Sequence, residues 1–182
     1  MDQSTIDTRA RHTLHALLRA RGYRTIRELD DGMLRATDHE GTYPTSESIL
    51  IVFATTGKLG IKPLRALENK INAEDHLMII YNRTITSFAR QEFDRMEEAG
   101  KHVETFDVNK LQFNIMEHAL VPPHTHITAP DARKMGLVPE KLPVMLRSDV
   151  VARWYGWGKG TVIQTTLCSP EGHTMREYRT VE

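Results

Sequence analysis

Three histidines near the middle of this 182-residue chain are its clearest candidates for chemistry. His118, His124 and His126 lie in the run His-Ala-Leu-Val-Pro-Pro-His-Thr-His. Imidazole is a common zinc ligand, and residues two apart on an extended strand share one face, so His124 and His126 could hold a metal ion together. A zinc site needs three or four ligands, and no CxxC, HExxH or second cluster accompanies these histidines. Packing or surface roles are therefore favoured, and we expect no metal and no other cofactor.

Two further patterns could carry catalysis. Cys168 is the single cysteine, and His173 follows across a predicted turn, but no positioned base or oxyanion site accompanies the pair. Glu68-Asn-Lys70 resembles the Asp/Glu-x-Lys of metal-dependent nucleases, yet it falls inside a predicted helix. The sequence thus predicts no catalytic residue, and a stand-alone nuclease, or a nuclease relic with an accessory domain, remains the alternative.

Composition narrows the class of protein. Lys plus Arg and Asp plus Glu each number 24, so the net charge gives no general attraction to nucleic acid. No apolar run approaches the roughly 18 residues of a membrane span, and the N-terminus lacks the pattern of a secretory signal. A single cysteine fits a reducing compartment. We therefore expect an intracellular protein with no membrane partner.

The first part of the chain alternates helical and strand-like segments. Apolar spacing predicts a helix over 4–21, coated by arginines that include Arg21, and a solvated face is favoured for them over a nucleic-acid surface. A polar loop is expected from Tyr23 to Ser48. The remaining segments predict strands and helices in alternation, which indicates a small layered α/β sheet. These are strands over 49–53, 76–81 and 102–106 and helices over 63–71 and 88–99.

Pro122 and Pro123 lie where the character of the chain changes. Both residues fix φ and lack an amide donor, so the segment is expected to be a stiff, extended connector between parts 1–116 and 117–182. The second part predicts short helices, one from Thr128 to near Gly136 and one capped by Ser148 or Asp149 and stopped by Gly156. A hairpin over 161–167 and 175–181 follows. Trp154, Tyr155 and Trp157 are either core residues or an aromatic interface. The fold class is α/β (α+β).

Several motifs together resemble one family. The run from Val103 to His124 contains E-x-F, L-x-x-N and H-x-L-V-P-x-H, and Arg21-Gly-Tyr23 ends the first helix. Leu142-Pro143 and the block Val151-Ala-Arg-x-Tyr155-Gly156 follow. The chain resembles, over nearly its whole length, the fifth subunit shared by eukaryotic nuclear RNA polymerases, whose C-terminal module corresponds to a separate small subunit of the archaeal RNA polymerase.

The resemblance implies a non-catalytic subunit of a multisubunit DNA-directed RNA polymerase. The second part would dock on the largest subunit beside other polymerase subunits, and the first would form part of the lower jaw near downstream DNA. The residues that the resemblance implies for docking are Leu120, Val121, Pro122, His124, Arg147, Asp149, Arg153, Tyr155, Tyr178 and Arg179. Those implied for DNA contact are Arg83, Thr86, Ser87 and Arg90.

The chain departs from the family pattern at several places, and the helix expected between Ile127 and Leu142 is shorter than in the family. Val150 stands where the family has proline after Asp149, Thr86 stands where it has proline in the turn near DNA, and Cys168-Ser-Pro-Glu-Gly172 replaces its final turn. A wedge-like DNA contact at Thr86 is therefore not expected, whereas arginines could still meet phosphates. Such drift suggests a divergent polymerase, either cellular and nuclear or that of a large DNA virus, acting in the virion or at the infected-cell transcription site.

Overall fold

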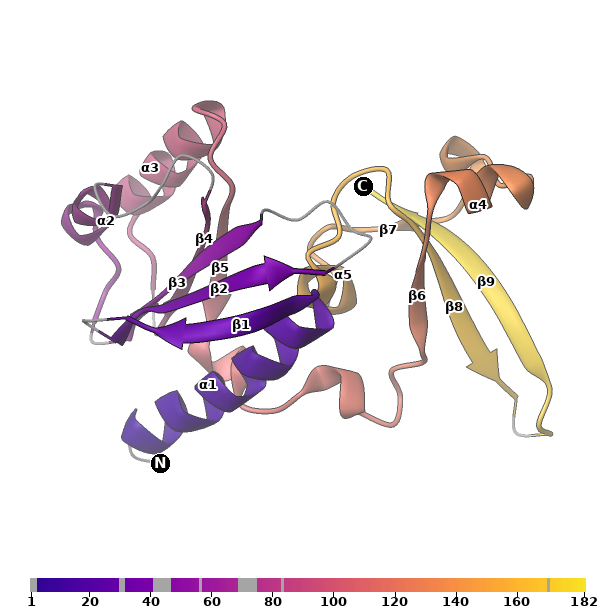
Figure 1. Cartoon of the computed structure of the whole chain (residues 1–182), viewed down its shortest axis with the longest axis horizontal. Helices are drawn as coiled ribbons and strands as arrows, with labels where there is room; N and C mark the ends of the chain where they lie inside the picture. Colours follow the sequence, from indigo (N-terminus) through magenta and orange to yellow (C-terminus); the bar gives the residue numbers. More distant parts are fainter. Residues whose placement is uncertain are drawn as a thin grey trace. The chain divides into compact units, whose positions relative to one another are not determined.

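The chain divides into two compact units, residues 1–113 and 114–182. The computed structural model describes residues 3–29, 32–40, 47–55, 57–68, 75–82, 84–169 and 171–182. Each unit has its own β-sheet and its own helices (Figure 1). The predicted mixed α/β class is confirmed.

The N-terminal sheet has the order β1-β2-β3-β4-β5. Its strands are β1 (Tyr23–Glu28), β2 (Leu34–His39), β3 (Ser48–Ala54), β4 (Asp75–Tyr81) and β5 (Val103–Asp107). The first two pairings are antiparallel, and β3-β4 and β4-β5 are parallel. The three predicted strands correspond to β3, β4 and β5.

The predicted polar loop after Tyr23 is wrong, because β1 and β2 form an antiparallel hairpin there. Only alternate positions of β2, Leu34 and Ala36, are buried, and polar residues separate them. A strand with one solvent-exposed face has no continuous apolar run, so its sequence predicts a strand less clearly than the sequences of the central strands do.

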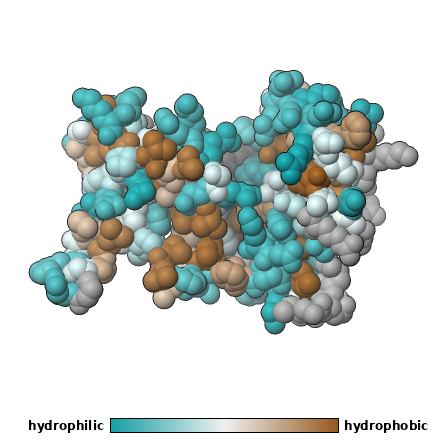
Figure 2. Space-filling view, turned by 180° about the vertical axis from the view of Figure 1, so that it is seen from behind, coloured by the Kyte–Doolittle hydropathy of each residue, from teal (hydrophilic) through white to brown (hydrophobic). Residues whose placement is uncertain are grey.

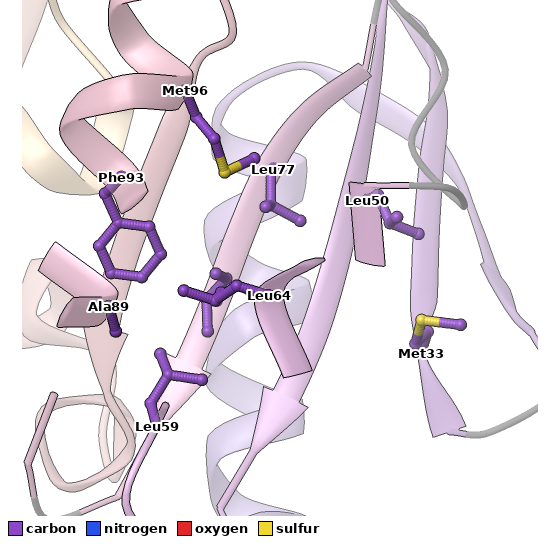
Figure 3. Packing of buried hydrophobic residues seen from close by; sticks show 9 residues of the cluster. Met33, Leu50, Leu59, Leu64, Leu77, Ala89, Phe93 and Met96 are labelled. Carbon is purple, nitrogen blue, oxygen red and sulfur yellow. The ribbon is translucent and has the colours of Figure 1, made fainter. Parts of the chain in front are cut away.

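Helices lie on both faces of this sheet. The helix α2 (Ile61–Glu68) and the helix α3 (Ser87–Glu98) pack on one face, where Leu64, Phe93 and Met96 meet Leu50 and Leu77 (Figure 3). The helix α1 (Gln3–Ala20) lies on the other face, since the Arg11 guanidinium sits 4.3 Å from the ring centre of Phe53, on the opposite side of β3 from Leu50. Residues 69–71 of the predicted second helix lie outside the described residues.

A buried charge cluster lies on the α1 face. Arg21 follows α1, and its guanidinium donates to both oxygens of Glu104, at 3.2 and 2.8 Å. His76 Nε2 lies 3.2 Å from Glu104 Oε1. The side chain of Arg21 is only 1% exposed. The prediction that Arg21 belongs to a solvated face is therefore wrong, because its carboxylate partner comes from β5, far along the chain.

The C-terminal sheet has the order β6-β8-β9-β7. Its strands are β6 (His124–Ile127), β7 (Val144–Met145), β8 (Val162–Cys168) and β9 (Thr174–Val181). The hairpin expected from the sequence is β8-β9. The segment after the two prolines is β6, which pairs antiparallel with β8, so the expected connector runs directly into this sheet. The unit also contains α4 (Ala129–Lys134), α5 (Val150–Tyr155) and the short 3₁₀ turns η3 (Ile115–Glu117) and η4 (Pro139–Lys141).

The two tryptophans of the C-terminal unit belong to its core. Trp154 and Trp157 are both buried, whereas Tyr155 is half-buried. Gly156, with φ of 72°, ends α5 in a left-handed conformation that glycine adopts at little cost. The amide of Trp157 then donates to the Ala152 carbonyl at 2.9 Å, which turns the chain back on the helix.

Candidate functional site

Trp157 is the centre of a cluster that gathers several of the candidate docking residues. Its ring stacks on Tyr155 with centroids 4.5 Å apart and an interplanar angle of 13°. The His124 ring lies 6.5 Å away in a tilted arrangement. Tyr155 is the last residue of α5, Trp157 follows just past Gly156, and His124 is the first residue of β6. Tyr155 and His124, 31 positions apart in the sequence, therefore contact the same indole.

The electrostatics of His124 show which charges surround this cluster. Burial lowers the pKa of His124, a hydrogen bond involving the Pro122 backbone and the charge of Asp149 act to raise it, and Arg179 acts to lower it. The net shift is downward, which favours the neutral ring near pH 7. Asp149 and Arg179 must lie near the imidazole to act on it. We call His124, Asp149, Tyr155, Trp157 and Arg179 the Trp157 cluster.

Asp149 has a local role as well. It is the N-cap of α5, and the amide of Val151 donates to its Oδ1 at 2.8 Å. Such a cap satisfies one of the orphan amides at the start of a helix. The carboxylate thus fixes α5 and also adds negative charge beside His124.

Replacing Asp149 tests both roles. Asp149→Ala is expected to lower the free energy of unfolding by about 1 kcal/mol, because the cap is lost. Asp149→Asn is expected to stay within a few tenths of a kcal/mol of the parent, since an amide oxygen also caps. Both variants should lower the pKa of His124 further, measured by NMR titration, because the charge that raises it is gone. An unchanged His124 pKa in both variants would show that Asp149 does not act on the ring.

The other candidate docking residues lie outside the cluster. Leu120 is 85% exposed in the turn before β6, with Val121 and Pro122 beside it. Arg147 is exposed before α5, and Arg153 is half-buried within it. Tyr178 neighbours Arg179 on β9, so its side chain points to the opposite face of the sheet.

Sequence reasoning did not assign Leu146 and Val150 to the docking surface, although both are large exposed apolar residues on either side of Asp149. They lie four positions apart around the start of α5. The sequence marks one of these positions as unusual, because Val150 stands where the family has proline. These two residues extend the candidate surface beyond the charged and aromatic positions.

The candidate histidines do not form a metal site with a third ligand. His124 and His126 share a face of β6 as expected, opposite Thr165 and Ile163 of β8. His118 instead closes a local turn, where its Nδ1 accepts from the Leu120 amide at 3.2 Å. Within the described ranges, no group of three or more His, Cys, Asp or Glu residues is placed to hold a metal ion.

The candidate DNA-contact residues lie at the start of α3. Thr86 is its N-cap: the Thr86 hydroxyl accepts from the Ala89 amide and donates to the Leu59 carbonyl, both at 3.2 Å. Ser87 and Arg90 are exposed, as is the large side chain of Phe88, which the sequence did not single out. Arg83 lies outside the described residues, as do Asn69 and Lys70 of the nuclease-like tripeptide, whose Glu68 ends α2.

Comparison with known proteins finds a family match over the C-terminal unit. Residues 113–181 match the family model described as RNA polymerase Rpb5, C-terminal domain.

Among the described helices, none is long and apolar enough to cross a membrane.

The chain is also similar to named polymerase subunits over about three quarters of its length. One is subunit rpabc1 of DNA-directed RNA polymerases I, II, and III of Dictyostelium discoideum, 28% identical over 141 residues that cover 74% of this chain and 72% of the relative. Its Caenorhabditis elegans counterpart is 28% identical over 143 residues, 75% of this chain and 67% of the relative. Subunit 5B of DNA-directed RNA polymerases IV and V of Arabidopsis thaliana is 24% identical over 146 residues, 76% and 66% of the two chains. The resemblance to the shared fifth subunit is confirmed.

Proposed function

We propose that this chain, whose residues 113–181 match the Rpb5 C-terminal domain, is a non-catalytic subunit of a multisubunit DNA-directed RNA polymerase. Its C-terminal unit anchors it on the largest subunit, and its N-terminal unit forms part of the lower jaw near downstream DNA. The observation that carries the proposal is the coincidence of the family match with one compact unit, residues 114–182. The similarity to named subunits extends into the N-terminal unit, which supports the second half of the proposal.

The surface of the C-terminal unit supports an anchoring role. Leu120, Leu146 and Val150 are exposed apolar side chains on the same unit as the Trp157 cluster. Figure 2 shows hydrophobic residues, in brown, exposed at the surface among hydrophilic residues, in teal. Exposed apolar side chains near aromatic and arginine residues are typical of protein interfaces. A unit this small also builds a marginal core, so a partner would stabilise it.

The N-terminal unit supports a weak DNA contact that depends on the complex. Ser87 and Arg90 are exposed in the first turn of α3, where the helix dipole and the arginine charge favour phosphate. The chain has equal numbers of acidic and basic residues, so most of the affinity for DNA would come from the rest of the polymerase. The nucleus is the expected site of action for a cellular source, and the virion or the infected cell for a viral one.

Copurification tests the proposal. The tagged chain, expressed in its source cells, is expected to recover the two large polymerase subunits at stoichiometric level. Tyr155→Ala and Arg153→Ala should each weaken incorporation roughly thirtyfold, the effect of about 2 kcal/mol at an interface hot spot. Arg24→Ala is the control, because Arg24 is an exposed residue of the N-terminal unit.

The outcomes separate the possible errors. Absence of the large subunits would overturn the proposal, and intact incorporation of both alanine variants would show that the docking face is misassigned. Each variant is first checked by thermal unfolding, so that misfolding is not mistaken for lost docking. Magnesium-dependent DNA cleavage by the purified chain that Glu68→Ala abolishes would instead support the nuclease alternative.

A further inference from the structure

The β8-β9 hairpin extends beyond both of its neighbours in the C-terminal sheet (Figure 1). Strand β6 pairs with β8 only from Val162 to Thr165, and β7 pairs with β9 only at Thr180 and Val181. The outer part of the hairpin, residues 167–168 with 174–175, is therefore two strands wide. An isolated two-stranded ribbon is marginally stable in water, and a third strand is the usual remedy.

The direction of the backbone groups along β9 follows from its hydrogen bonds. The Val181 amide donates to the Thr161 carbonyl of the chain entering β8 at 2.9 Å, and the Ser169 amide donates to the His173 carbonyl at 2.8 Å at the far end of the hairpin. The Thr180 amide points the other way and donates to the Pro143 carbonyl at 3.0 Å. Because direction alternates along a strand, the N–H and C=O groups of Arg176 and Tyr178 also point away from β8. Within the described part of the chain, no strand pairs with them.

The side chains at this edge specify what kind of strand could pair there. Met175 is 58% exposed and lies opposite Leu167 of β8, so it offers an apolar contact on one face. Arg176 is exposed on the other face, and among the described residues no carboxylate forms an ion pair with it. An incoming strand would therefore be matched by a carboxylate beside Arg176 and an apolar side chain beside Met175.

A second copy of this chain is a poor occupant. Antiparallel self-pairing through the outward-facing residues centres either on Arg176, which places two arginines opposite each other, or on Glu177, which places two glutamates opposite each other. Like charges directly opposite are destabilising. The three remaining centres, Thr174, Met175 and Tyr178, lie nearer the ends of the open edge and pair fewer residues.

We propose that the outer edge of β9, at residues 174–178, receives an extended segment of a neighbouring polymerase subunit whose side chains alternate between acidic and apolar. The segment adds a strand to the C-terminal sheet, bonding to the backbone of Arg176 and Tyr178. This inference rests on the proposed function, since the partner is a subunit of the same complex. The proposed function places docking at the Trp157 cluster, whereas this inference adds a second contact at the backbone edge of β9.

Amide hydrogen exchange at single-residue resolution tests the inference, with the free chain compared with the purified polymerase that contains it. The Arg176 and Tyr178 amides are expected to slow by roughly two- to tenfold each on assembly, the protection that one hydrogen bond gives. The Met175 and Glu177 amides already point to β8 and serve as internal controls, because they gain no new partner. Equal protection of the outward amides (Arg176 and Tyr178) and the inward amides (Met175 and Glu177) would indicate general burial and would overturn strand addition.

Two substitutions at Arg176 sharpen the test. Arg176→Pro removes the outward N–H without removing a bond to β8, and proline is tolerated at such an edge position. Arg176→Ala removes the charge but keeps the N–H. Strand addition predicts that the proline variant loses protection at Tyr178 in the assembled enzyme while the alanine variant retains it. The two free chains should unfold at similar temperatures.

The possible failures can be told apart. A chain that copurifies with polymerase but shows no change at Arg176 and Tyr178 would overturn the inference and leave the proposed function intact. A chain that does not copurify would overturn both. Protection in the free chain that grows with its concentration would assign the edge to a second copy and would contradict the inference.

Discussion

Replacement of Glu104 by glutamine is expected to lower the free energy of unfolding by about 3–5 kcal/mol, measured by chemical denaturation at pH 7. Glutamine has nearly the same shape as glutamate, so the main change is the loss of charge. Arg21 would remain with its side chain 1% exposed and without its bidentate carboxylate, whose shorter bond is 2.8 Å. Removing the charge of one partner of a buried ion pair is costly, because the neutral amide of glutamine offsets less of the guanidinium charge than the carboxylate does.

A second ion pair of similar length provides the control. Arg24 Nε lies 2.9 Å from Glu40 Oε2, but both side chains are exposed. Glu40→Gln should change the free energy of unfolding by less than about 1 kcal/mol, since exposed pairs contribute little in water. Equal small effects of the two substitutions would contradict the burial of the Arg21–Glu104 pair.

The same pair has a defined pH dependence. Burial raises the pKa of the Glu104 carboxyl, but Arg21 and His76 outweigh burial and hold its pKa well below the usual range. The unfolded-state pKa of glutamate is about 4.3. A group whose folded pKa is depressed stabilises the fold above its unfolded pKa, and this stabilisation is lost as pH falls toward the folded value. The stability difference between the parent and Glu104→Gln should therefore be constant from pH 7 to about 5 and shrink below about pH 4.

Arg21 shows why sequence predicted some parts of this fold and not others. The strands β3 and β4 are predicted because each contains a short apolar run, and β5 because a strand-like segment follows the helix that Gly100 ends; both are local signals. Arg21 was assigned to a solvated face because local pattern shows only a charged residue at a helix end. Its burial depends on Glu104, which lies 83 positions away. The hairpin β1-β2 was missed for a related reason, since half of its residues face water.

The candidate docking surface was likewise predictable only in part, because local motifs name its residues but not their contacts. The motifs point to His124, Asp149, Tyr155 and Arg179 as a set, but nothing in their spacing shows that His124 and Tyr155 contact one indole or that Asp149 and Arg179 act on His124. Trp157 lies just past Gly156, and only the left-handed turn there and the pairing of β6 with β8 bring it beside His124. Leu146 and Val150 are apolar residues that the sequence did not assign to the surface, and the structure places them there.

Trp157→Ala is the substitution expected to affect the C-terminal unit most, with a loss of about 3–5 kcal/mol in its free energy of unfolding. The indole is only 5% exposed, so its removal forfeits buried apolar area and leaves a cavity. It also removes the ring on which Tyr155 stacks at 4.5 Å. Chemical denaturation followed by far-UV circular dichroism measures the loss. Tyr155→Phe is the matched control, because phenylalanine keeps the stack and should stay within about 1 kcal/mol of the parent.

A second measurement on Trp157→Ala distinguishes loss of the cluster from general loss of stability. Burial is the largest cause of the lowered pKa of His124, and the indole 6.5 Å away is part of the surroundings that bury it. Removing the indole admits water to the imidazole, so the pKa of His124 should rise toward its ordinary value, followed by NMR under conditions where the variant is folded. The pKa of His126, which burial also lowers, is measured in the same spectra for comparison. A stability loss below about 1 kcal/mol with an unchanged His124 pKa would contradict the role of Trp157 as the residue that holds the cluster together.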